Sequence, residues 1–179
     1  NVNITLLFGQ EMYEAVAWAY IGALEARLSR PGADGRIDRM ASVASFFVSR
    51  IDTKVDALLH DKAKAASGVE RARLERLFGK VAIANARVAY QIYKRVFAGA
   101  RWEALEAKGA RRQRLLWAST SVKNPIYRDV MYVEELIGPD TVNTMPPGLI
   151  DAFRDHGDVQ RTVDKRHGAA EGVLREIEA

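Results

Sequence analysis

The sequence has no cysteine, only three histidines and five prolines among its 179 residues. Without cysteine, a disulfide framework, a thiolate metal site and a cysteine nucleophile are excluded. His60, His156 and His167 are scattered, and they lack the spacing of metal ligands, so we expect no metal. No apolar run reaches the ~20 residues that cross a bilayer, which excludes a membrane-spanning segment. There is also no Gly-rich phosphate loop and no zinc-finger spacing.

Hydrophobic residues make up 48% of the chain and charged residues 28%, which is ordinary for a globular protein and too apolar for disorder. The length predicts a single domain over residues 1–179, with 158–179 as a C-terminal helical tail. The net charge is only +4. Arg111, Arg112 and Arg114 form the densest basic group. Such a group can attract nucleic acid or a phosphorylated metabolite, and we favour the simpler interpretation of a solvated turn before a strand.

Short apolar segments of strand length alternate with segments of helical period. After the first strand, apolar residues recur at three- and four-residue steps over 10–29, and Arg30-Pro31-Gly32 ends that helix. The expected strands are Val2–Phe8, Val43–Val48, Leu115–Ser119 and Thr141–Thr144. The other expected helical segments are 51–78, 83–97, Tyr127–Ile137, Leu149–His156 and Val163–Glu178.

This alternation predicts an α/β fold with parallel strands joined by right-handed crossovers. Two arrangements satisfy it, an open doubly wound sheet or part of a (β/α)₈ TIM-type barrel. A whole barrel needs ~250 residues, so four units amount to about half of one. Half a barrel leaves two unpaired strand edges and therefore requires more chain or a partner. Because the chain opens at Asn1 inside a predicted strand, we expect further sequence before it.

Polar side chains follow one face of the first two strands. Asn3 and Thr5 alternate with apolar neighbours, as do Ser45 and Phe47, and Arg50 comes just after the second strand. In a barrel interior these amides and hydroxyls would bind a substrate; the alternative is a hydrogen-bonded network within the sheet. The planar fork of Arg50 suits a phosphate or a carboxylate ligand, and pairing with Asp52 is the equal alternative.

The third strand runs into the sequence Ser119-Thr120-Ser121-Val122-Lys123-Asn124-Pro125. Three hydroxyls and a lysine at a strand end form a candidate pocket wall, because α/β folds bind ligands at the carboxyl ends of their strands. From the residues alone, Lys123 is either a phosphate-binding cation or a Schiff-base amine. The other interpretation is a hydrophilic turn, which Pro125 favours.

Three segments in the same order resemble transaldolases. NVNITLLF resembles the Asn-x-Thr-Leu-Leu-Phe strand of that family, and SVASFFVSR resembles its Ser-Pro-Phe-Val-Gly-Arg strand. LLWASTSVKNP, followed by YVEELIGPDTVNTMP, resembles the last two strands of the branch found in actinobacteria and in transaldolase–isomerase fusions. The resemblance covers nearly all of residues 1–157. It implies a (β/α)₈ barrel of which this chain supplies about strands five to eight.

The resemblance also implies an activity. Transaldolases move a dihydroxyacetone unit from a ketose phosphate to an aldose phosphate through a lysine Schiff base, in the pentose phosphate pathway and without a metal or organic cofactor. The implied partners are sedoheptulose 7-phosphate, fructose 6-phosphate, erythrose 4-phosphate and glyceraldehyde 3-phosphate. We therefore expect a cytoplasmic transferase that binds neither nucleic acid nor membrane.

Residue by residue, Asn3 matches the asparagine that holds the dihydroxyacetone part, and Thr5 the threonine that helps to position the catalytic water. Ser45 and Phe47 match substrate-binding positions. Arg50 matches a phosphate-binding arginine, and Lys123 stands where a second phosphate-binding cation is usual. Lysine there keeps the charge and loses the planar fork of arginine.

The main departure from the family is an absence. The Schiff-base lysine of transaldolases lies on the strand before Asn-x-Thr, which here would precede Asn1. We therefore expect the isolated 179 residues to be inactive. The rival hypothesis is a noncatalytic half-barrel association module that pairs its strand edges in a homo-oligomer. A third is a basic nucleic-acid binder held by phosphate contacts.

Overall fold

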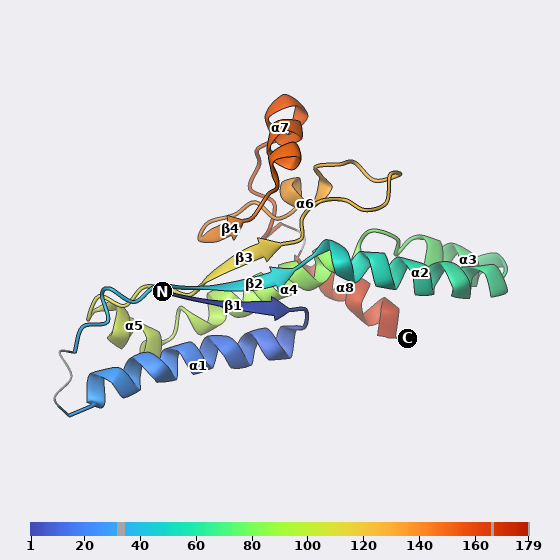
Figure 1. The fold of residues 1–179 in the computed structure, drawn as a ribbon. Coiled ribbons are helices and arrows are strands. Elements are labelled where there is room, and N and C mark those ends of the chain that lie inside the picture. Colours follow the sequence, from blue (N-terminus) through green and yellow to red (C-terminus); the bar gives the residue numbers. More distant parts are fainter. Residues whose placement is uncertain (32–34, 166, 179) are drawn as a thin grey trace.

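The computed structural model describes residues 1–31, 35–165 and 167–178. Its four strands form one sheet, and they are β1 (Val2–Leu7), β2 (Ser42–Phe47), β3 (Arg114–Ala118) and β4 (Thr141–Asn143). The strands lie side by side in sequence order, and every neighbouring pair is parallel (Figure 1). This order is that of a β/α barrel wall, whereas a doubly wound sheet reverses its strand order part-way. The predicted α/β class with a parallel sheet is confirmed.

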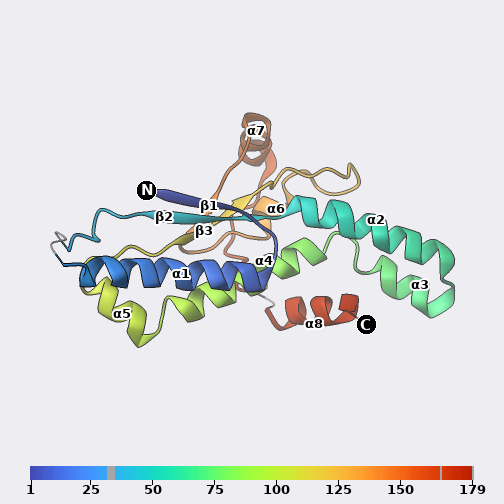
Figure 2. The same cartoon turned by 60° about the horizontal axis from the view of Figure 1, so that its bottom comes forward.

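The helices are α1 (Gln10–Ser29), α2 (Ser49–Ala65), α3 (Gly68–Glu75), α4 (Val81–Val96), α5 (Ala100–Glu106), α6 (Met131–Glu134), α7 (Pro147–His156) and α8 (His167–Glu178). Helices α1 and α4 lie along one face of the sheet, while α2 and α3 run outward beyond the strand ends (Figure 2). Helix α8 packs on α4. In the described part of the chain, no helix combines the length and hydropathy needed to cross a membrane.

The core lies between the sheet and helices α1 and α4. Ala44, Phe46, Leu115 and Trp117 alternate along β2 and β3, and all four are buried in this cluster. The ring of Phe46 meets Trp117 edge to face at a centroid distance of 6.2 Å. The indole N–H of Trp117 donates to the carbonyl of Leu136 at 2.9 Å, so its one polar atom is satisfied although the side chain is buried.

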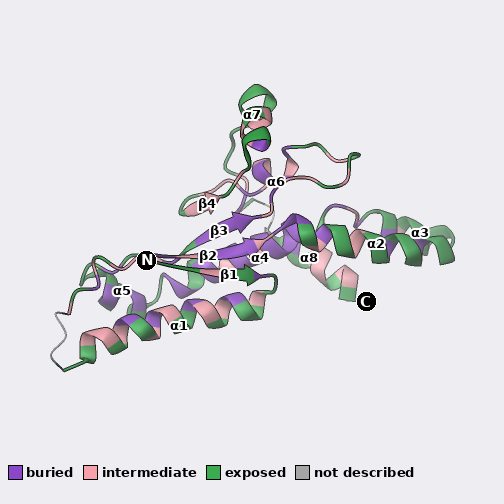
Figure 3. Ribbon diagram, in the orientation of Figure 1, coloured by how far each residue is buried: buried purple, intermediate pink, exposed green. Residues whose placement is uncertain are grey.

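The opposite face of the sheet is open along β1 but buried over much of β2 and β3. Asn3 and Thr5 of β1 are exposed, and Phe47 of β2 is half-buried. Figure 3 shows burial concentrated in β2, β3 and α4, with β1 largely exposed. Strand β1 is an edge of this sheet and leaves Val2 53% and Leu6 59% exposed. The polar side chains predicted to share a strand face are thus on the side away from the helices.

Several helix bounds differ from those predicted. The segment 51–78 is two helices, because α2 ends at Ala65 and the backbone of Gly68 has a φ of 57°. Between Tyr127 and Ile137, only the short α6 is helical. Helix α5 was not predicted, and its seven residues include the buried Trp102 and Leu105. Such short helices are fixed by tertiary packing more than by periodicity.

The last helix also begins later than predicted, at His167 instead of Val163. Val163 is fully buried, and its backbone N–H donates to the carbonyl of Ile137 at 3.1 Å. A Cβ on Gly138 would lie 2.2 Å from Cγ1 of Val163, so this glycine leaves room for the valine. Val163 therefore anchors a turn at 163–165 to the chain after α6.

Candidate active site

The first two strands bring together two of the predicted site residues. The hydroxyl of Ser45 donates to Oδ1 of Asn3 at 2.8 Å, across the β1–β2 pair. Ser45 is 3% exposed, whereas Asn3 is exposed. The serine thus fixes one end of the amide, and the remaining amide donors of Asn3 face the open side of the sheet.

Strand alternation places Thr5 on the same face as Asn3, where it is exposed. Just after Thr5, the pairing of β1 with β2 shifts register between Ile4 and Leu7. Leu6 within this shift has a φ of 62°, a left-handed conformation that is unusual for a bulky residue. A bulge of this kind re-aims side chains at a strand end, and here it lies at the carboxyl end of β1.

Arg50 lies just past β2, in the first turn of α2. Its guanidinium lies over the ring of Phe47, with Cζ 4.9 Å from the ring centroid, and Phe8 flanks the same ring at 5.2 Å. Arg50 is exposed, and none of the described residues forms an ion pair with it. The alternative pairing with Asp52 is not found, because Asp52 is buried and bonded elsewhere. The aromatic ring therefore holds a cation whose hydrogen-bond donors are free.

Hydroxyls and an amide continue this polar row along the ends of β3 and β4. Ser49 and Ser119 are joined through their hydroxyls at 3.0 Å. The hydroxyl of Thr120 donates to Oδ1 of Asn143 at 2.8 Å. Ser119 has a φ of 57°, a strained conformation of the kind that gathers at functional sites. Asn143 was not singled out from the sequence, because β4 is three residues long and gives little periodicity.

Lys123 lies in a different setting from Asn3 and Ser45. It is exposed and lines a hollow of about 420 Å³ together with Asp52, Asp56 and His60. Lys123 forms no ion pair with a residue in the described ranges. The structure therefore pairs Asn3 with Ser45 and Phe47 with Arg50, and it places Lys123 in a hollow lined by carboxylates.

Asp52 is 1% exposed, and its carboxyl accepts two hydrogen bonds. The donors are the backbone N–H of Ala82 at 2.7 Å and the hydroxyl of Tyr132 at 2.9 Å. Burial raises the pKa of Asp52 from 3.8 to about 6; the two hydrogen bonds lower it, and the charge of Asp56 raises it further. A carboxyl with a pKa near neutrality beside a hollow is a candidate functional group, and the sequence had suggested it only as a partner for Arg50.

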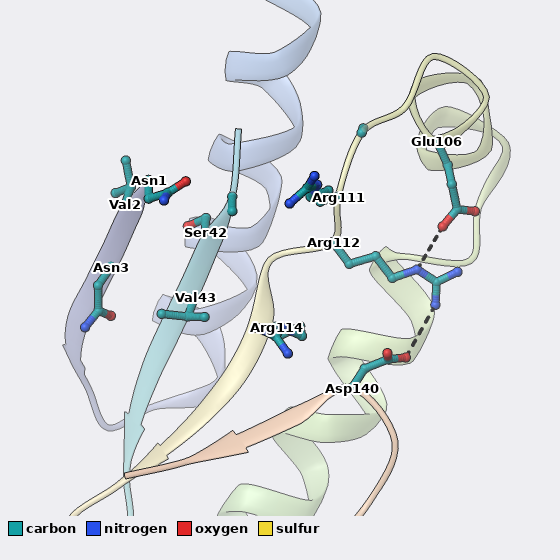
Figure 4. A pocket seen from close by; sticks show the side chains of 12 residues that line it. Asn1, Val2, Asn3, Ser42, Val43, Glu106, Arg111, Arg112, Arg114 and Asp140 are labelled. Carbon is teal, nitrogen blue, oxygen red and sulfur yellow. Dashed lines mark hydrogen bonds and ion pairs between the residues drawn. The ribbon is translucent and has the colours of Figure 1, made fainter. Parts of the chain in front are cut away.

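The basic group 111–114 lies at the other end of the sheet. It lines a hollow of about 790 Å³ at the amino ends of the strands, shown in Figure 4. Arg112 lies between Glu106, at 3.2 Å, and Asp140, at 4.0 Å. Asn3 also lines this hollow, whereas Ser45, Phe47 and Arg50 do not.

Comparison with known proteins shows the family of this chain. The profile of the family described as Transaldolase/Fructose-6-phosphate aldolase matches residues 1–179. The chain belongs to this family. It is 56% identical to a transaldolase of Trichodesmium erythraeum over 99% of the chain and 46% of that protein. It is 58% identical to transaldolase 2 of Nostoc punctiforme over 89% of the chain and 42% of that protein.

A third relative, transaldolase 1 of Streptomyces avermitilis, is 48% identical over 99% of the chain and 45% of that protein. The chain thus spans less than half the length of these curated transaldolases. The resemblance to transaldolases noted in the sequence is confirmed. Within the described ranges, no group of three or more His, Asp or Glu side chains is placed to hold a metal ion.

Gly79 lies against Tyr127, which lines the same hollow as Lys123. Gly79 has a φ of 68°, and a Cβ there would lie 2.8 Å from Cζ of Tyr127. Replacing Gly79 by alanine is expected to destabilise the protein by about 1–3 kcal/mol, through backbone strain and displacement of the tyrosine ring. Chemical denaturation of the full-length protein measures the loss. Gly148→Ala is the control, because a Cβ there meets nothing within 4 Å; equal stability of the two variants would refute the prediction.

Proposed function

We propose that the protein containing this chain is a transaldolase, which transfers a dihydroxyacetone unit between a ketose phosphate and an aldose phosphate through a lysine Schiff base. We further propose that the chain supplies strands five to eight of a (β/α)₈ barrel. The observation that carries this is the Asn3–Ser45 hydrogen bond on the face of the sheet away from the helices, with Arg50 just past the carboxyl end of β2, in a chain whose curated relatives are transaldolases. The sequence-order parallel sheet, with helices on one face, supports the barrel.

The chemistry needs a neutral amine that attacks the ketose carbonyl and loses water to form an iminium. The iminium accepts the electrons of the broken C–C bond when a base removes the proton of the neighbouring hydroxyl, and the aldose phosphate leaves. The remaining enamine adds to a second aldose phosphate, and water then releases the product. Covalent catalysis of this kind divides one difficult step into easier ones.

In this proposal the chain binds the substrate and another part of the protein supplies the amine. Asn3, held by Ser45, binds the dihydroxyacetone hydroxyls, and Thr5 helps to position the hydrolytic water. Phe47 supports Arg50, and Arg50 and Lys123 bind the phosphate. No lysine occurs in β1, β2, β3 or β4. Lys123 is exposed, whereas a Schiff-base lysine is activated by desolvation or by a neighbouring cation.

The substrates we propose are the sugar phosphates of the pentose phosphate pathway, namely sedoheptulose 7-phosphate, fructose 6-phosphate, erythrose 4-phosphate and glyceraldehyde 3-phosphate, in the cytoplasm. The exposed guanidinium of Arg50 supports a phosphorylated substrate, because its planar fork matches phosphate oxygens. An assay of the full-length protein with fructose 6-phosphate and erythrose 4-phosphate, coupled to detection of glyceraldehyde 3-phosphate, tests the activity. Absence of turnover would refute the proposed function.

Asn3 gives a second prediction. In the full-length protein, Asn3→Ala is expected to lower kcat/KM for fructose 6-phosphate about tenfold, because the variant loses the amide that binds the sugar and frees the hydroxyl of Ser45. The coupled assay measures it. Gln160→Ala removes an exposed amide that donates to Asp158 and serves as the control. Equal rates for the wild type and Asn3→Ala would exclude Asn3 from the site.

The association hypothesis is kept as the second candidate because β1 is an exposed sheet edge with apolar side chains. It predicts a stable dimer of the isolated 179-residue chain, whereas the transaldolase proposal predicts that this chain has no activity. Light scattering after size-exclusion chromatography, together with the coupled assay, separates the two. An active monomer of the isolated chain would contradict both.

A further inference from the structure

Two carboxylates on α2 bind the chain segments around them in the same way. Asp52 and Asp56 are one helical turn apart and share a face of α2. Asp52 accepts from the N–H of Ala82 and the hydroxyl of Tyr132, as described above. Asp56 accepts from the N–H of Gly79 at 3.1 Å and the hydroxyl of Tyr127 at 2.7 Å. Each carboxylate thus joins α2 to the start of α4 and to the segment after β3.

Close packing of the two tyrosine side chains adds to these hydrogen bonds. The ring of Tyr127 lies against Gly79, where a Cβ would come within 2.8 Å of it. Tyr132 is 2% exposed and belongs to the core between sheet and helices. Hydrogen bonds to ionised acceptors are strong, so each hydroxyl is held by its carboxylate, and the Tyr127 ring is also held by its contact with Gly79. The two tyrosines therefore have one position each relative to α2.

The joined segments are those that carry the two proposed phosphate-binding cations. Arg50 is in the first turn of α2, two residues before Asp52. Lys123 precedes a turn in which the N–H of Tyr127 donates to the carbonyl of Asn124 at 3.1 Å. The same Asn124 accepts the N–H of Ile126 through its side chain at 3.2 Å. The turn is thus a compact unit that Tyr127 ties to Asp56.

We propose that Tyr127 and Tyr132 are positioning residues, which set the spacing between Arg50 and Lys123 through Asp56 and Asp52. They thereby determine the preference of the site for a phosphorylated sugar. The inference rests on the proposed transaldolase function and extends it to residues that do not touch the substrate. The carboxylates serve as fixed acceptors for the tyrosines, and the cations remain free to bind phosphate.

The test uses the full-length protein carrying Tyr127→Phe or Tyr132→Phe. With fructose 6-phosphate as donor, each variant is expected to raise KM about tenfold and to leave kcat within about twofold, because phosphate binding is weakened and the chemical step is not. With unphosphorylated fructose as donor, KM is expected to stay unchanged. Tyr20→Phe is the matched control. Tyr20 is on α1, and this substitution removes a hydroxyl hydrogen bond of 2.8 Å to the carbonyl of Arg111 without touching α2 or the segment after β3.

Asp56→Asn provides a third variant that keeps an oxygen acceptor, and with Tyr127→Phe it completes a double-mutant cycle. Effects on KM that do not add would support one shared role. An unchanged KM for fructose 6-phosphate, or an equal loss with both donors, would overturn the inference. A wild-type protein without turnover of fructose 6-phosphate would instead refute the proposed function, so the two failures are distinguishable.

Discussion

Arg50→Gln in the full-length protein is expected to lower kcat/KM for fructose 6-phosphate about a hundredfold. The guanidinium lies 4.9 Å from the centroid of the Phe47 ring and has no ion-pair partner in the described ranges, so its donors are available to a phosphate. Loss of charge-assisted hydrogen bonds, worth about 1.5–3 kcal/mol each, accounts for a change of this size. Glutamine keeps much of the side-chain length and removes the charge and the fork.

A matched control for this variant is Arg101→Gln. Arg101 also lies over an aromatic ring, with Cζ 5.4 Å from the centroid of Trp18, and it pairs with Glu25 at 2.6 Å. It is on α5, away from the strand ends that carry Arg50. We expect the control to leave kcat/KM within about twofold, as is usual for surface pairs. A similar loss in both variants would show that stacking, and not phosphate binding, underlies the effect.

Asp52→Asn is expected to change the pH dependence of stability. Burial in the fold raises the pKa of Asp52 from 3.8 to about 6, so the folded state holds this proton more tightly than the unfolded state. The stability that the group contributes is therefore fully present below pH 3.8 and is lost as the pH rises through about 6. The full loss is on the order of 3 kcal/mol. Asparagine does not titrate, so the variant should gain stability relative to the wild type as the pH rises.

Urea denaturation of the two full-length proteins at several pH values between 3 and 8 measures this difference. Asp164→Asn provides a control of opposite sign, because the hydrogen bond from Arg161 lowers the pKa of Asp164. That carboxylate stabilises the fold above its unfolded pKa, and the contribution is lost as the pH falls. If the stability of Asp52→Asn relative to the wild type stayed constant with pH, or fell as the pH rose, the result would contradict the buried, proton-binding state of Asp52.

Local pattern was sufficient to predict the strands and the face that Asn3 and Ser45 share. Strand alternation has a period of two, so the apolar residues Ala44 and Phe46 on one side determine that Ser45 faces the other. The long helix α1 was also predicted at its observed bounds, and its buried residues Tyr13, Ala17, Ile21 and Leu24 recur at four- and three-residue steps. Chemistry that depends on one strand and its direct neighbour can therefore be derived before the fold is known.

The partners of Asp52 and Asp56 could not be derived in this way. Tyr132 and Tyr127 are 80 and 71 residues away in sequence, and α6, which carries Tyr132, is only four residues long. Nothing in the spacing of aspartates along α2 shows which hydroxyls they accept. A general signal was present, because a carboxylate on the apolar face of an amphipathic helix needs a hydrogen-bond partner when it is buried. The sequence pattern therefore shows that a buried carboxylate requires a hydrogen-bond donor, but it does not show which residue donates.

The most direct test of the account is to locate the covalent intermediate. The full-length protein is incubated with fructose 6-phosphate, reduced with borohydride and digested, and the peptide that carries a three-carbon adduct is identified by mass spectrometry. The account predicts the adduct on a lysine outside residues 1–179, with Lys123 unmodified. An adduct on Lys123 would contradict it, because the amine would then belong to the same wall that we assign to phosphate binding.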